Sequence, residues 1–504
     1  MATSLIHHRE NWLIGYSSRE LTDLAEQRYQ ALKRYSTPPT ILLTERNPIE
    51  FLAGFIAACS ANCSIFLGNP DWVEAEWQQV FELVTPDLIW GEPAPSFNVS
   101  STNPDEPPPN PQHWGRWSSK SPNAGGFRGH DRPVTKPPNS RVSRGVHPIK
   151  SFPALHASPL IMIPTGGTSG KIRFAMHTWE TLTASVQGFR QYFGVDRVHS
   201  FCVLPLYHVS GLMQFMRSFL SDGQLVILPW KALEAGEVQS ISPQNFFLSL
   251  VPTQLQKLLS HRQTVSWLSQ CETILLGGAP AWADLLDQAR SYQLPIAPTY
   301  GMTETASQIV TLKPEDFLKS KLGSGQALPH AQITITSETG EPLAISKTGK
   351  ITIQADSLML GYYPNFLQQP VYQPDDLGFF DSQGYLQIVG RDSNKIITGG
   401  ENVFPAEVEA AIMATKLVKD VCVLGICDRV WGQAITAVYV PQHSDVSDQT
   451  LITSLEKTLS KFKRPKYWIS LENLPRNPQG KINHPQLRQI IAAKTDTSMI
   501  PAKV

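Results

Sequence analysis

The spacing of hydrophobic residues divides the chain into helical and extended segments. Tyr16–Tyr35 has an amphipathic helical period and Ile49–Ser60 is largely apolar, which predicts a helix in each; Thr40–Thr44 between them predicts a buried strand. After residue 159, short apolar runs recur and are often followed by helical patterns. These runs are Leu160–Ile163, Phe201–Leu204, Leu225–Leu228, Phe247–Val251 and Thr273–Leu276. Such alternation predicts an α/β architecture with parallel sheets.

The pattern changes beyond Gly323. Gln332–Thr336 and Lys350–Gln354 alternate between apolar and polar residues, as strands with one exposed face do. A helix at Pro405–Ala414 and a strand at Val421–Leu424 then predict a smaller α+β unit. Because 504 residues exceed one ordinary domain, we expect separate cores. The predicted domains are a large one at 1–390 and a small one at 391–504.

The segment 93–150 differs from the rest of the chain. It holds twelve of the 40 prolines, together with many Ser, Asn and Gly residues. Such a composition cannot bury enough apolar surface to offset the entropy lost on ordering. We therefore predict a disordered or loosely attached insertion. Its eight Lys or Arg residues against three acidic ones leave a docking arm for an acidic partner as the alternative.

Composition excludes some classes of protein. Hydrophobic residues make up 41% of the chain, and 43 basic residues balance 43 acidic ones, so a globally basic nucleic-acid binder is not expected. The six cysteines form no CxxC pair and have mostly apolar neighbours, which favours buried thiols in a reducing compartment. Residues 1–16 lack the apolar core of a signal peptide, and no apolar run is long enough to span a membrane. We predict a cytoplasmic protein without membrane insertion.

Candidate chemistry first occurs in the loop Pro164–Lys171, which follows an apolar run. Its glycines let backbone amides turn toward an anion, while hydroxyl groups and a lysine can contact phosphate oxygens. A Walker A loop is excluded, because only three residues separate Gly166 from Gly170-Lys171, and Ile172 follows. An ordinary surface turn is the other interpretation. The candidate phosphate-binding residues are Thr165, Gly166, Gly167, Thr168, Ser169, Gly170 and Lys171.

Five further motifs follow this loop in order along the chain. They are Leu276–Pro280, Tyr300–Thr305, Asp375–Asp381, Gly390–Glu409 and Pro475–Lys481. With the loop, they resemble the core motifs of the acyl-adenylate-forming superfamily of acyl-CoA synthetases, adenylation domains and luciferases. The resemblance covers nearly everything outside 93–150. It implies a large α/β N-terminal domain of several subdomains, a smaller mobile α+β C-terminal domain, and activation of a carboxylic acid with ATP.

The chemistry of adenylation gives these motifs individual roles. Attack of a carboxylate on the α-phosphate builds negative charge, so the site requires Mg²⁺ and cations. Glu304 beside Thr303 suits Mg²⁺, and Asp376 can accept both ribose hydroxyls, although each is also compatible with a solvated loop carboxylate. By resemblance, adenine lies between the backbone at 277–279 and Tyr300. The candidate nucleotide-binding residues are Gly277, Gly278, Ala279, Tyr300, Gly301, Thr303, Asp376 and Arg391.

Lys481 is the cation that the resemblance assigns to adenylation. It lies in a loop rich in Pro, Asn and Gly, from which a long side chain can reach the α-phosphate. The resemblance further implies that the small domain rotates about Ser393 between adenylation and thioester formation, with Gly399 and Gly400 beside the arm of coenzyme A. Rotation would let one site perform two reactions in turn.

The identity of the acid is indicated by a narrower resemblance. Tyr207–Leu212, Tyr300–Leu312, Lys321–Gln326 and Ile397–Glu409 resemble o-succinylbenzoate–CoA ligases of menaquinone and phylloquinone biosynthesis. His208 is expected near the acyl pocket, with a structural histidine as the alternative. The substrate is a dianion, so a cation is expected near its second carboxylate, because burying an unpaired charge is costly. The candidate acyl-site residues are His208, Arg217, Ser307 and Gln308.

Some positions depart from the superfamily pattern, and other functions stay open. The phosphate loop lacks the common Thr-Ser-Gly-Thr-Thr-Gly start. Arg173 replaces the usual Lys, Lys350 the usual acidic residue, and Asn394 the usual Asp.

The alternative functions are another aryl- or acyl-CoA ligase, an adenylation domain that loads a carrier protein, and a non-catalytic nucleotide-binding scaffold. No carrier-like segment follows Lys481, which disfavours the second. Monomer and homodimer are both compatible with the sequence.

Overall fold

The computed structural model describes residues 9–92, 159–166, 172–237, 241–398, 401–428, 431–456, 458–477 and 480–495. All of them belong to one compact unit. The predicted insertion at 93–150 and the segment 1–8 lie outside the described residues. No helix within the described ranges is long and apolar enough to cross a membrane.

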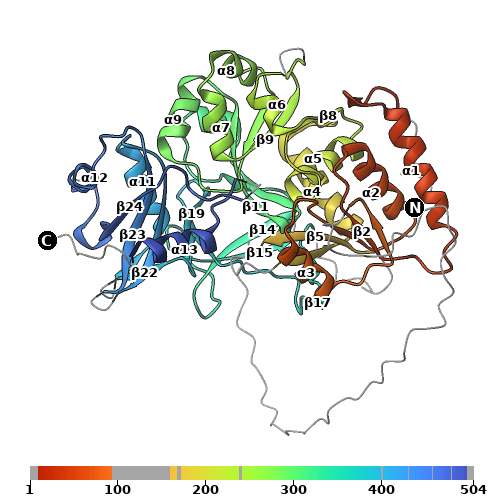
Figure 1. The fold of residues 1–504 in the computed structure, drawn as a ribbon. Helices are drawn as coiled ribbons and strands as arrows, with labels where there is room; N and C mark the ends of the chain where they lie inside the picture. The colour runs from red at the N-terminus through yellow and green to blue at the C-terminus, as the bar shows by residue number, and fades with distance from the viewer. Residues whose placement is uncertain are drawn as a thin grey trace, which may run out of the picture. The chain divides into compact units, whose positions relative to one another are not determined.

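The first sheet has seven strands in the order β17-β16-β6-β5-β3-β2-β4. Strands β2 to β5 pair in parallel, whereas β6, β16 and β17 are antiparallel additions at one edge. Their bounds are β2 Ile41–Leu43, β3 Ile65–Leu67, β4 Leu88–Trp90, β5 Ile161–Gly166, β6 Ile172–His177, β16 Gly361–Tyr362 and β17 Asn365–Phe366. Figure 1 shows the first helices and strands of this region in red to orange at one end of the ribbon.

Local capping explains where the first helices begin. Helix α1 (Ser18–Leu32) starts after Ser17, whose side chain accepts a hydrogen bond from the N–H of Glu20. Helix α2 (Pro48–Ser60) starts after Asn47, which accepts from the N–H of Ile49. Both confirm the predicted helices, with α1 shorter at each end than its hydrophobic period. Helix α3 spans Glu74–Leu83.

The second sheet has eight strands in the order β1-β8-β7-β9-β10-β11-β12-β13. It is parallel from β1 to β11, and β12 and β13 are antiparallel. The strand bounds are β1 Leu13–Ile14, β7 His199–Cys202, β8 Leu225–Ile227, β9 Phe246–Leu250, β10 Thr273–Leu276, β11 Ile296–Met302, β12 Ser307–Thr311 and β13 Gln326–Ala327. This topology confirms the predicted parallel α/β architecture.

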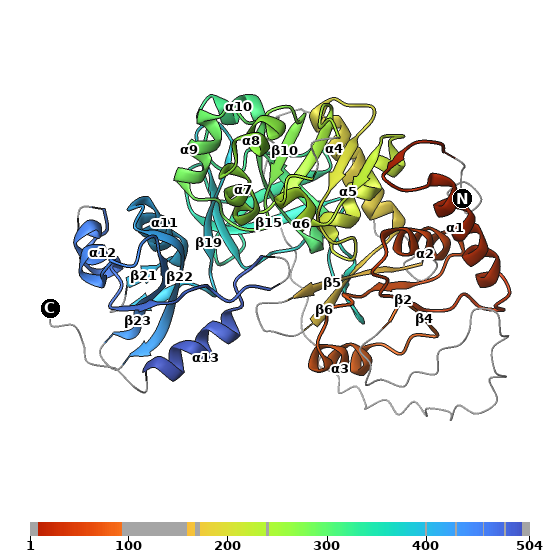
Figure 2. The same cartoon turned by 45° about the horizontal axis from the view of Figure 1, so that its top comes forward.

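Helices cover both faces of the eight-stranded sheet. They are α4 Trp179–Phe193, α5 Val209–Leu220, α6 Trp230–Glu234, α7 Pro252–Leu259, α8 Arg262–Leu268, α9 Ala283–Ser291 and α10 Pro314–Leu318. One core combines α2, α4 and α5 with strands of both large sheets. A second core joins the opposite face of the eight-stranded sheet to α7, α8 and α9, which Figure 2 shows grouped together. The apolar runs in this sheet follow from burial on both sides.

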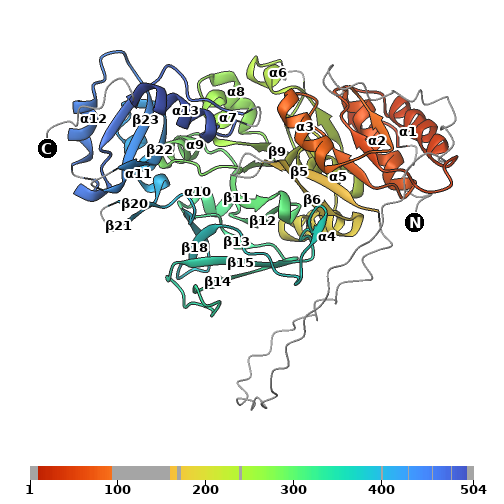
Figure 3. The ribbon, with the colours of Figure 1, turned by 60° about the horizontal axis from the view of Figure 1, so that its bottom comes forward.

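A four-stranded antiparallel sheet follows, in the order β14-β15-β18-β19. Its strands are β14 Ala331–Thr336, β15 Gly349–Ala355, β18 Asp376–Phe380 and β19 Leu386–Arg391, and Figure 3 shows β14, β15 and β18 as a separate layer. Alternate residues such as Ile333, Ile335, Ile351 and Ile353 form its core. The predicted change to alternating strands is confirmed.

The last sheet has five strands and belongs to the smaller α+β domain. They are β20 Ile396–Thr398, β21 Glu401–Val403, β22 Val418–Asp428, β23 Gly432–Pro441 and β24 Tyr467–Ser470. Helices α11 (Pro405–Ala414) and α12 (Asp448–Leu455) pack on one face, and α13 (His484–Thr495) on the other. The chain leaves the four-stranded sheet at Arg391 and enters this one at Ile396. The exact boundary at 390/391 stays a prediction.

Two sequence predictions need correction. Pro164, Thr165 and Gly166 belong to strand β5 and not to the loop, because the antiparallel ladder with β6 continues to the pair Gly166–Ile172. All six cysteines are free, but Cys427 is exposed, so buried thiols do not describe the whole set. It lies near the end of the long strand β22, where the strand leaves the core.

Candidate active site

One group of candidate residues lies at or just beyond the carboxyl ends of β10 and β11 in the eight-stranded sheet. Gly277–Ala279 come directly after β10, and the segment 300–308 runs from the end of β11 through the short 3₁₀ helix η2 (Thr303–Thr305) into β12. In parallel α/β sheets this edge is where ligands bind. The phosphate loop connects β5 to β6 in the other large sheet; Thr165 and Gly166 lie in the strand, and 167–171 lie outside the described residues.

Two glycines in these turns are needed for close packing. A Cβ atom on Gly301 would lie 2.2 Å from the carbonyl oxygen of Ser307, and one on Gly277 would lie 2.4 Å from the Thr299 hydroxyl oxygen. Side chains at either position would separate β11 from its neighbours. Gly278 and Ala279, which follow Gly277, are exposed to solvent.

Asp376 connects the eight-stranded and four-stranded sheets. Its Oδ2 atom accepts a hydrogen bond of 2.8 Å from the Tyr300 hydroxyl, and its Oδ1 atom lies 3.4 Å from Nε of Arg391, its partner across the β18–β19 ladder. Burial, and then the neighbouring Asp376 carboxylate, raise the pKa of Tyr300 well above its usual range. Tyrosine, carboxylate and guanidinium, all named from the sequence, are thus in direct contact.

Glu304 is a buried carboxylate in the turn after β11. The Tyr362 hydroxyl donates a hydrogen bond to its Oε1 atom and lies 3.1 Å from the Tyr372 hydroxyl. The guanidinium of Arg173 stacks over the Tyr362 ring at 4.1 Å. Burial and the nearby Glu304 carboxylate raise the pKa of Tyr362, which keeps the phenol protonated as a donor.

A histidine that the sequence reasoning missed holds this same turn. His177, at the end of β6, lies with Nε2 2.8 Å from the carbonyl oxygen of Thr303. A carbonyl only accepts, so Nε2 carries the proton and donates. Burial lowers the pKa of His177 to about 4, which keeps the ring neutral near pH 7. The Nδ1 atom contacts the Thr181 hydroxyl at 3.1 Å, so both ring nitrogens have partners.

Lys481 comes from the small domain and lies within electrostatic reach of the large one. Surrounding protein atoms and the positive charge of Arg391 lower the pKa of its ammonium group, while Glu304 and Asp376 oppose this shift. The residue nevertheless keeps a solvent-exposed surface. A Cβ atom on the preceding Gly480 would lie 3.4 Å from the Thr253 hydroxyl oxygen of α7. The lysine is therefore near the two carboxylates expected to hold nucleotide and metal.

Arg217 is a buried cation with neutral partners. On α5, it is 2% exposed, and its Nη2 atom donates to Ser307 Oγ at 3.0 Å and to Gln308 Oε1 at 2.9 Å. Its guanidinium lies 4.3 Å from the centre of the Phe189 ring. Within the described residues it forms no ion pair, and its Nε atom has no hydrogen-bond partner. Burial lowers its pKa to about 9, which still leaves it positively charged near pH 7.

Two histidines near this region have ring nitrogens without partners. His208 precedes α5, and its inaccessible Nε2 atom has no hydrogen-bond partner in the described structure. Burial, and then Lys481, lower its pKa to about 4. His330, which the sequence reasoning missed, is 9% exposed and has neither ring nitrogen paired within the described residues. The role of His208 near the acyl pocket stays a prediction.

Comparison with known proteins gives the family. The AMP-binding enzyme family matches residues 14–363, and its C-terminal domain matches residues 407–481. This chain belongs to the AMP-binding enzymes. It is 35% identical over 335 residues to a 2-succinylbenzoate–CoA ligase of Bacillus velezensis, covering 65% of this chain and 68% of the relative. The corresponding ligase of Enterococcus faecalis is 33% identical over 328 residues, covering 63% and 67%.

Solved structures share the fold of this AMP-binding enzyme. The o-succinylbenzoate CoA synthetase from Bacillus subtilis, in complex with its acyl-adenylate intermediate, has a TM-score of 0.75 and 24% identity over 98% of this chain and 96% of that one. ATP-bound MatB from Rhodopseudomonas palustris has a TM-score of 0.75 and 21% identity over 95% of each chain. The large N-terminal and small C-terminal domains match this fold.

Ser393, the expected hinge residue of this enzyme, is held by Asp375. Its N–H lies 3.1 Å from Asp375 Oδ2, and its hydroxyl donates to the same oxygen. These hydrogen bonds attach the expected hinge residue to the loop that precedes β18. Gly399 and Gly400, the expected coenzyme A contacts, lie outside the described residues.

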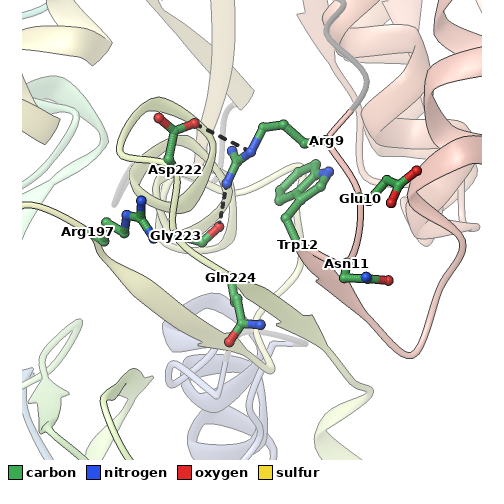
Figure 4. A pocket seen from close by; sticks show the side chains of 8 residues that line it. All are labelled: Arg9, Glu10, Asn11, Trp12, Arg197, Asp222, Gly223 and Gln224. Atoms are coloured by element: carbon green, nitrogen blue, oxygen red, sulfur yellow. Dashed lines mark hydrogen bonds and ion pairs between the residues drawn. The ribbon is translucent and has the colours of Figure 1, made fainter.

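A surface pocket away from the candidate residues is drawn in Figure 4. It is lined by Arg9, Glu10, Asn11, Trp12, Arg197, Asp222, Gly223 and Gln224. Arg9 donates to the carbonyl oxygens of Phe219 and Gly223 and lies 3.4 Å from Asp222. These contacts attach the N-terminal segment to the end of α5. None of the candidate active-site residues lines this pocket.

Proposed function

We propose that this AMP-binding enzyme is a 2-succinylbenzoate–CoA ligase of menaquinone or phylloquinone biosynthesis. A carboxylate oxygen of the acid attacks the α-phosphorus of ATP, the bond to the β-phosphate breaks, and pyrophosphate leaves. The thiol sulfur of coenzyme A then attacks the acyl carbon of the adenylate, AMP leaves, and the thiol proton is lost to solvent. The similar ligases of Bacillus velezensis and Enterococcus faecalis support this assignment.

The observation that carries the choice of acid is the buried Arg217. A cation without a carboxylate partner is costly to bury, and its neutral neighbours Ser307 and Gln308 leave its charge uncompensated. 2-Succinylbenzoate has two carboxylates, of which only one is activated. The second would form a charge-assisted pair with Arg217, and the two neighbours would hold the guanidinium in orientation.

We assign the nucleotide to the Asp376 side of the site. Asp376 is held by Tyr300 and Arg391, so its carboxylate is fixed where a ribose could replace part of these contacts. We assign adenine to Gly277, Gly278 and Ala279, of which the last two are exposed directly after β10. Thr165 and Gly166 lead into the loop assigned to phosphate. Lys481 supplies positive charge as the α-phosphate gains negative charge.

The residues around Glu304 fit Mg²⁺. Within the described residues no group of three or more His, Cys, Asp or Glu side chains could hold a metal ion, and Glu304 forms no ion pair there. Mg²⁺ in nucleotide sites is bound by one or two carboxylates and the phosphates, so a single buried carboxylate suffices. We assign Glu304 as ligand, with Thr303 beside it; the bound ion would neutralise phosphate charge.

His208 and Ser393 receive the remaining roles. Because its lowered pKa keeps His208 uncharged near pH 7, it would contact the acid as a neutral hydrogen-bonding ring. Ser393 is proposed as the point of rotation between the half-reactions, with Gly399 and Gly400 lining the path of coenzyme A. Such rotation has to break the hydrogen bonds from Ser393 to Asp375.

The experiment is acid-dependent release of pyrophosphate, followed by detection of the thioester. Purified full-length protein would receive ATP, Mg²⁺ and coenzyme A with 2-succinylbenzoate, benzoate, cinnamate, a fatty acid, or 4-oxo-4-phenylbutanoate, which lacks the second carboxylate. We expect 2-succinylbenzoate to give the highest kcat/KM. Preference for another acid would support a different aryl- or acyl-CoA ligase, and no reaction with any acid would support a non-catalytic scaffold.

We place the reaction in the cytoplasm, where ATP and coenzyme A are available and thiols stay reduced. The six free cysteines support such a compartment. The proposed partners are these small molecules, without nucleic acid or membrane insertion. Monomer and homodimer remain alternatives that gel filtration with light scattering would separate.

A further inference from the structure

The turn that carries Lys481 is attached to the small domain through Arg476. The Nη2 atom of Arg476 lies 2.8 and 2.7 Å from the two carboxylate oxygens of Asp420, and its Nη1 atom donates to the carbonyl oxygen of Gly480 at 2.6 Å. The side chains of this ion pair are 26% and 30% exposed. One guanidinium therefore joins strand β22 to the peptide group directly before Lys481.

The backbone of this turn is fixed on its other side as well. The Lys481 N–H donates to the side-chain oxygen of Asn477 at 2.9 Å, and the Lys481 carbonyl accepts from the Asn477 N–H at 2.8 Å. Gly480 has a φ of +78°, a conformation that glycine adopts without strain. With the main chain held in this way, the freedom of Lys481 is confined to its own side chain.

Asp420, the anchor for Arg476, is held within strand β22. Asp420 lies at an irregularity in the β22–β23 ladder and accepts a hydrogen bond from the N–H of Val421 at 3.0 Å. On α11, the partly buried Glu409 accepts a hydrogen bond from the N–H of Val423 at 2.8 Å, and the charges of Asp420 and Arg476 act on its carboxyl group. The guanidinium thus faces carboxyl groups fixed by a sheet and a helix, whereas Lys481 faces the large domain.

We propose that Arg476 and Asp420 are positioning residues for adenylation, which act by setting where the Lys481 ammonium can reach. The inference rests on the proposed function. A planar guanidinium that contacts Asp420 through Nη2 and the Gly480 carbonyl through Nη1 restricts both distance and orientation, which a point charge such as lysine cannot reproduce. Small displacements of a catalytic group lower the rate strongly, so a loose turn impairs the step that uses Lys481. Thioester formation from a preformed adenylate does not depend on this position.

The test separates positioning from general support of the fold. Arg476→Met, Arg476→Lys and Asp420→Asn are compared in the full chain, with Glu407→Gln as the matched control. Glu407 pairs with Lys463 at 2.5 Å in the same domain. Single-turnover adenylation, thioester formation from supplied acyl-adenylate, and thermal unfolding are measured for each variant.

We expect Arg476→Met and Asp420→Asn to lower the rate of adenylation about 10- to 100-fold, with little change in the KM for ATP. Arg476→Lys should recover part of the rate, and thioester formation should stay within about two-fold of the wild type. The control should leave both steps unchanged. In a Lys481→Ala background, Arg476→Met should have no further effect, because the pair acts through that lysine.

The proposal is overturned if both half-reactions fall equally, if the loss only follows a loss of folded protein, or if Arg476→Met still lowers adenylation without Lys481. The wild type is first assayed with every acid of the panel, which separates failure of this proposal from failure of the proposed function. If another acid is preferred, the variants are compared with that acid. If none reacts, both proposals are wrong.

Discussion

Arg217 and Arg476 show two ways in which this chain places a guanidinium inside the protein. Arg476 is bound to both oxygens of Asp420, so its charge is compensated within the small domain. Arg217 is more deeply buried, and among the described residues its guanidinium interacts with a hydroxyl, an amide and an aromatic ring but with no carboxylate. The charge of Arg476 is compensated inside the protein, whereas we propose that the charge of Arg217 is compensated by the second carboxylate of the acid.

The largest effect is expected for Lys481→Ala, which removes the group that Arg476 is proposed to position. Adenylation should fall on the order of 10³-fold, because a cation facing developing phosphate charge is lost. Conversion of supplied acyl-adenylate to thioester should continue. Pyrophosphate release and thioester formation, measured separately, check this result; equal loss of both would contradict the assignment.

Arg217→Met should have the next largest effect and tests the other half of the comparison. We expect kcat/KM for 2-succinylbenzoate to fall about 100-fold, because a buried charge pair with the second carboxylate is lost. The value for 4-oxo-4-phenylbutanoate should change much less, since that acid has no second carboxylate. A similar loss with both acids would show that Arg217 supports the fold and not the recognition of a dianion.

Tyr300→Phe should have a smaller effect, because it removes one hydrogen bond to a carboxylate that Arg391 still contacts. We expect the KM for ATP to rise about 3- to 10-fold and the KM for the acid to stay nearly constant. Steady-state kinetics with each substrate varied in turn provide the measurement. An effect confined to the acid would place Tyr300 outside the nucleotide site.

Among these variants, Glu409→Gln is expected to have the smallest effect on turnover. It should nevertheless change the free energy of unfolding measurably. Burial, followed by the nearby Asp420, raises the pKa of Glu409 to about 7, while Arg476 opposes the shift. Above that pH, Glu409 is charged and partly buried in the folded protein, whereas the unfolded chain keeps the same charge in water. The contribution of Glu409 to stability therefore falls as pH rises from its pKa in the unfolded chain to its pKa in the folded protein. The glutamine should therefore add about 1–3 kcal/mol of stability at pH 8.5 and much less at pH 5. Urea unfolding at pH 8.5 and at pH 5 measures this difference, with Glu407→Gln as the control. An equal increase in stability at the two pH values would contradict the explanation.

Local sequence patterns were sufficient for most of the fold. Helix α11 begins and ends where Pro405–Ala414 predicted, because a proline at the first turn and an apolar period coincide there. Strand β5 was predicted too short, since Pro164 was read as a loop residue. β5 is the central strand of its sheet, but its ladder with β3 ends at Met162, and only the antiparallel ladder with β6 continues through Pro164. The strand propensity of residues 160–166 does not reveal which strands pair with β5.

The candidate site was predictable only where residues lie in recognisable motifs. Contacts between Tyr300, Asp376 and Arg391 follow from three motifs that the fold brings together. His177 and Tyr362 were missed because each acts on the Glu304 turn from more than fifty residues away, through single hydrogen bonds. Arg476 lay inside a recognised motif, but its partner Asp420 has no sequence signal beyond an acidic residue in a strand.

The ladder between β5 and β6 has a consequence for how this protein can vary over evolution. Gly166 pairs with Ile172 and Thr165 with Arg173, so the number of residues between the two strands is tied to the pairing. A single inserted or deleted residue that shifted this ladder by one position would turn Arg173 to the opposite side of the sheet, away from the Tyr362 ring. The length of this hairpin is therefore constrained by strand pairing, independently of the side chains that its loop carries.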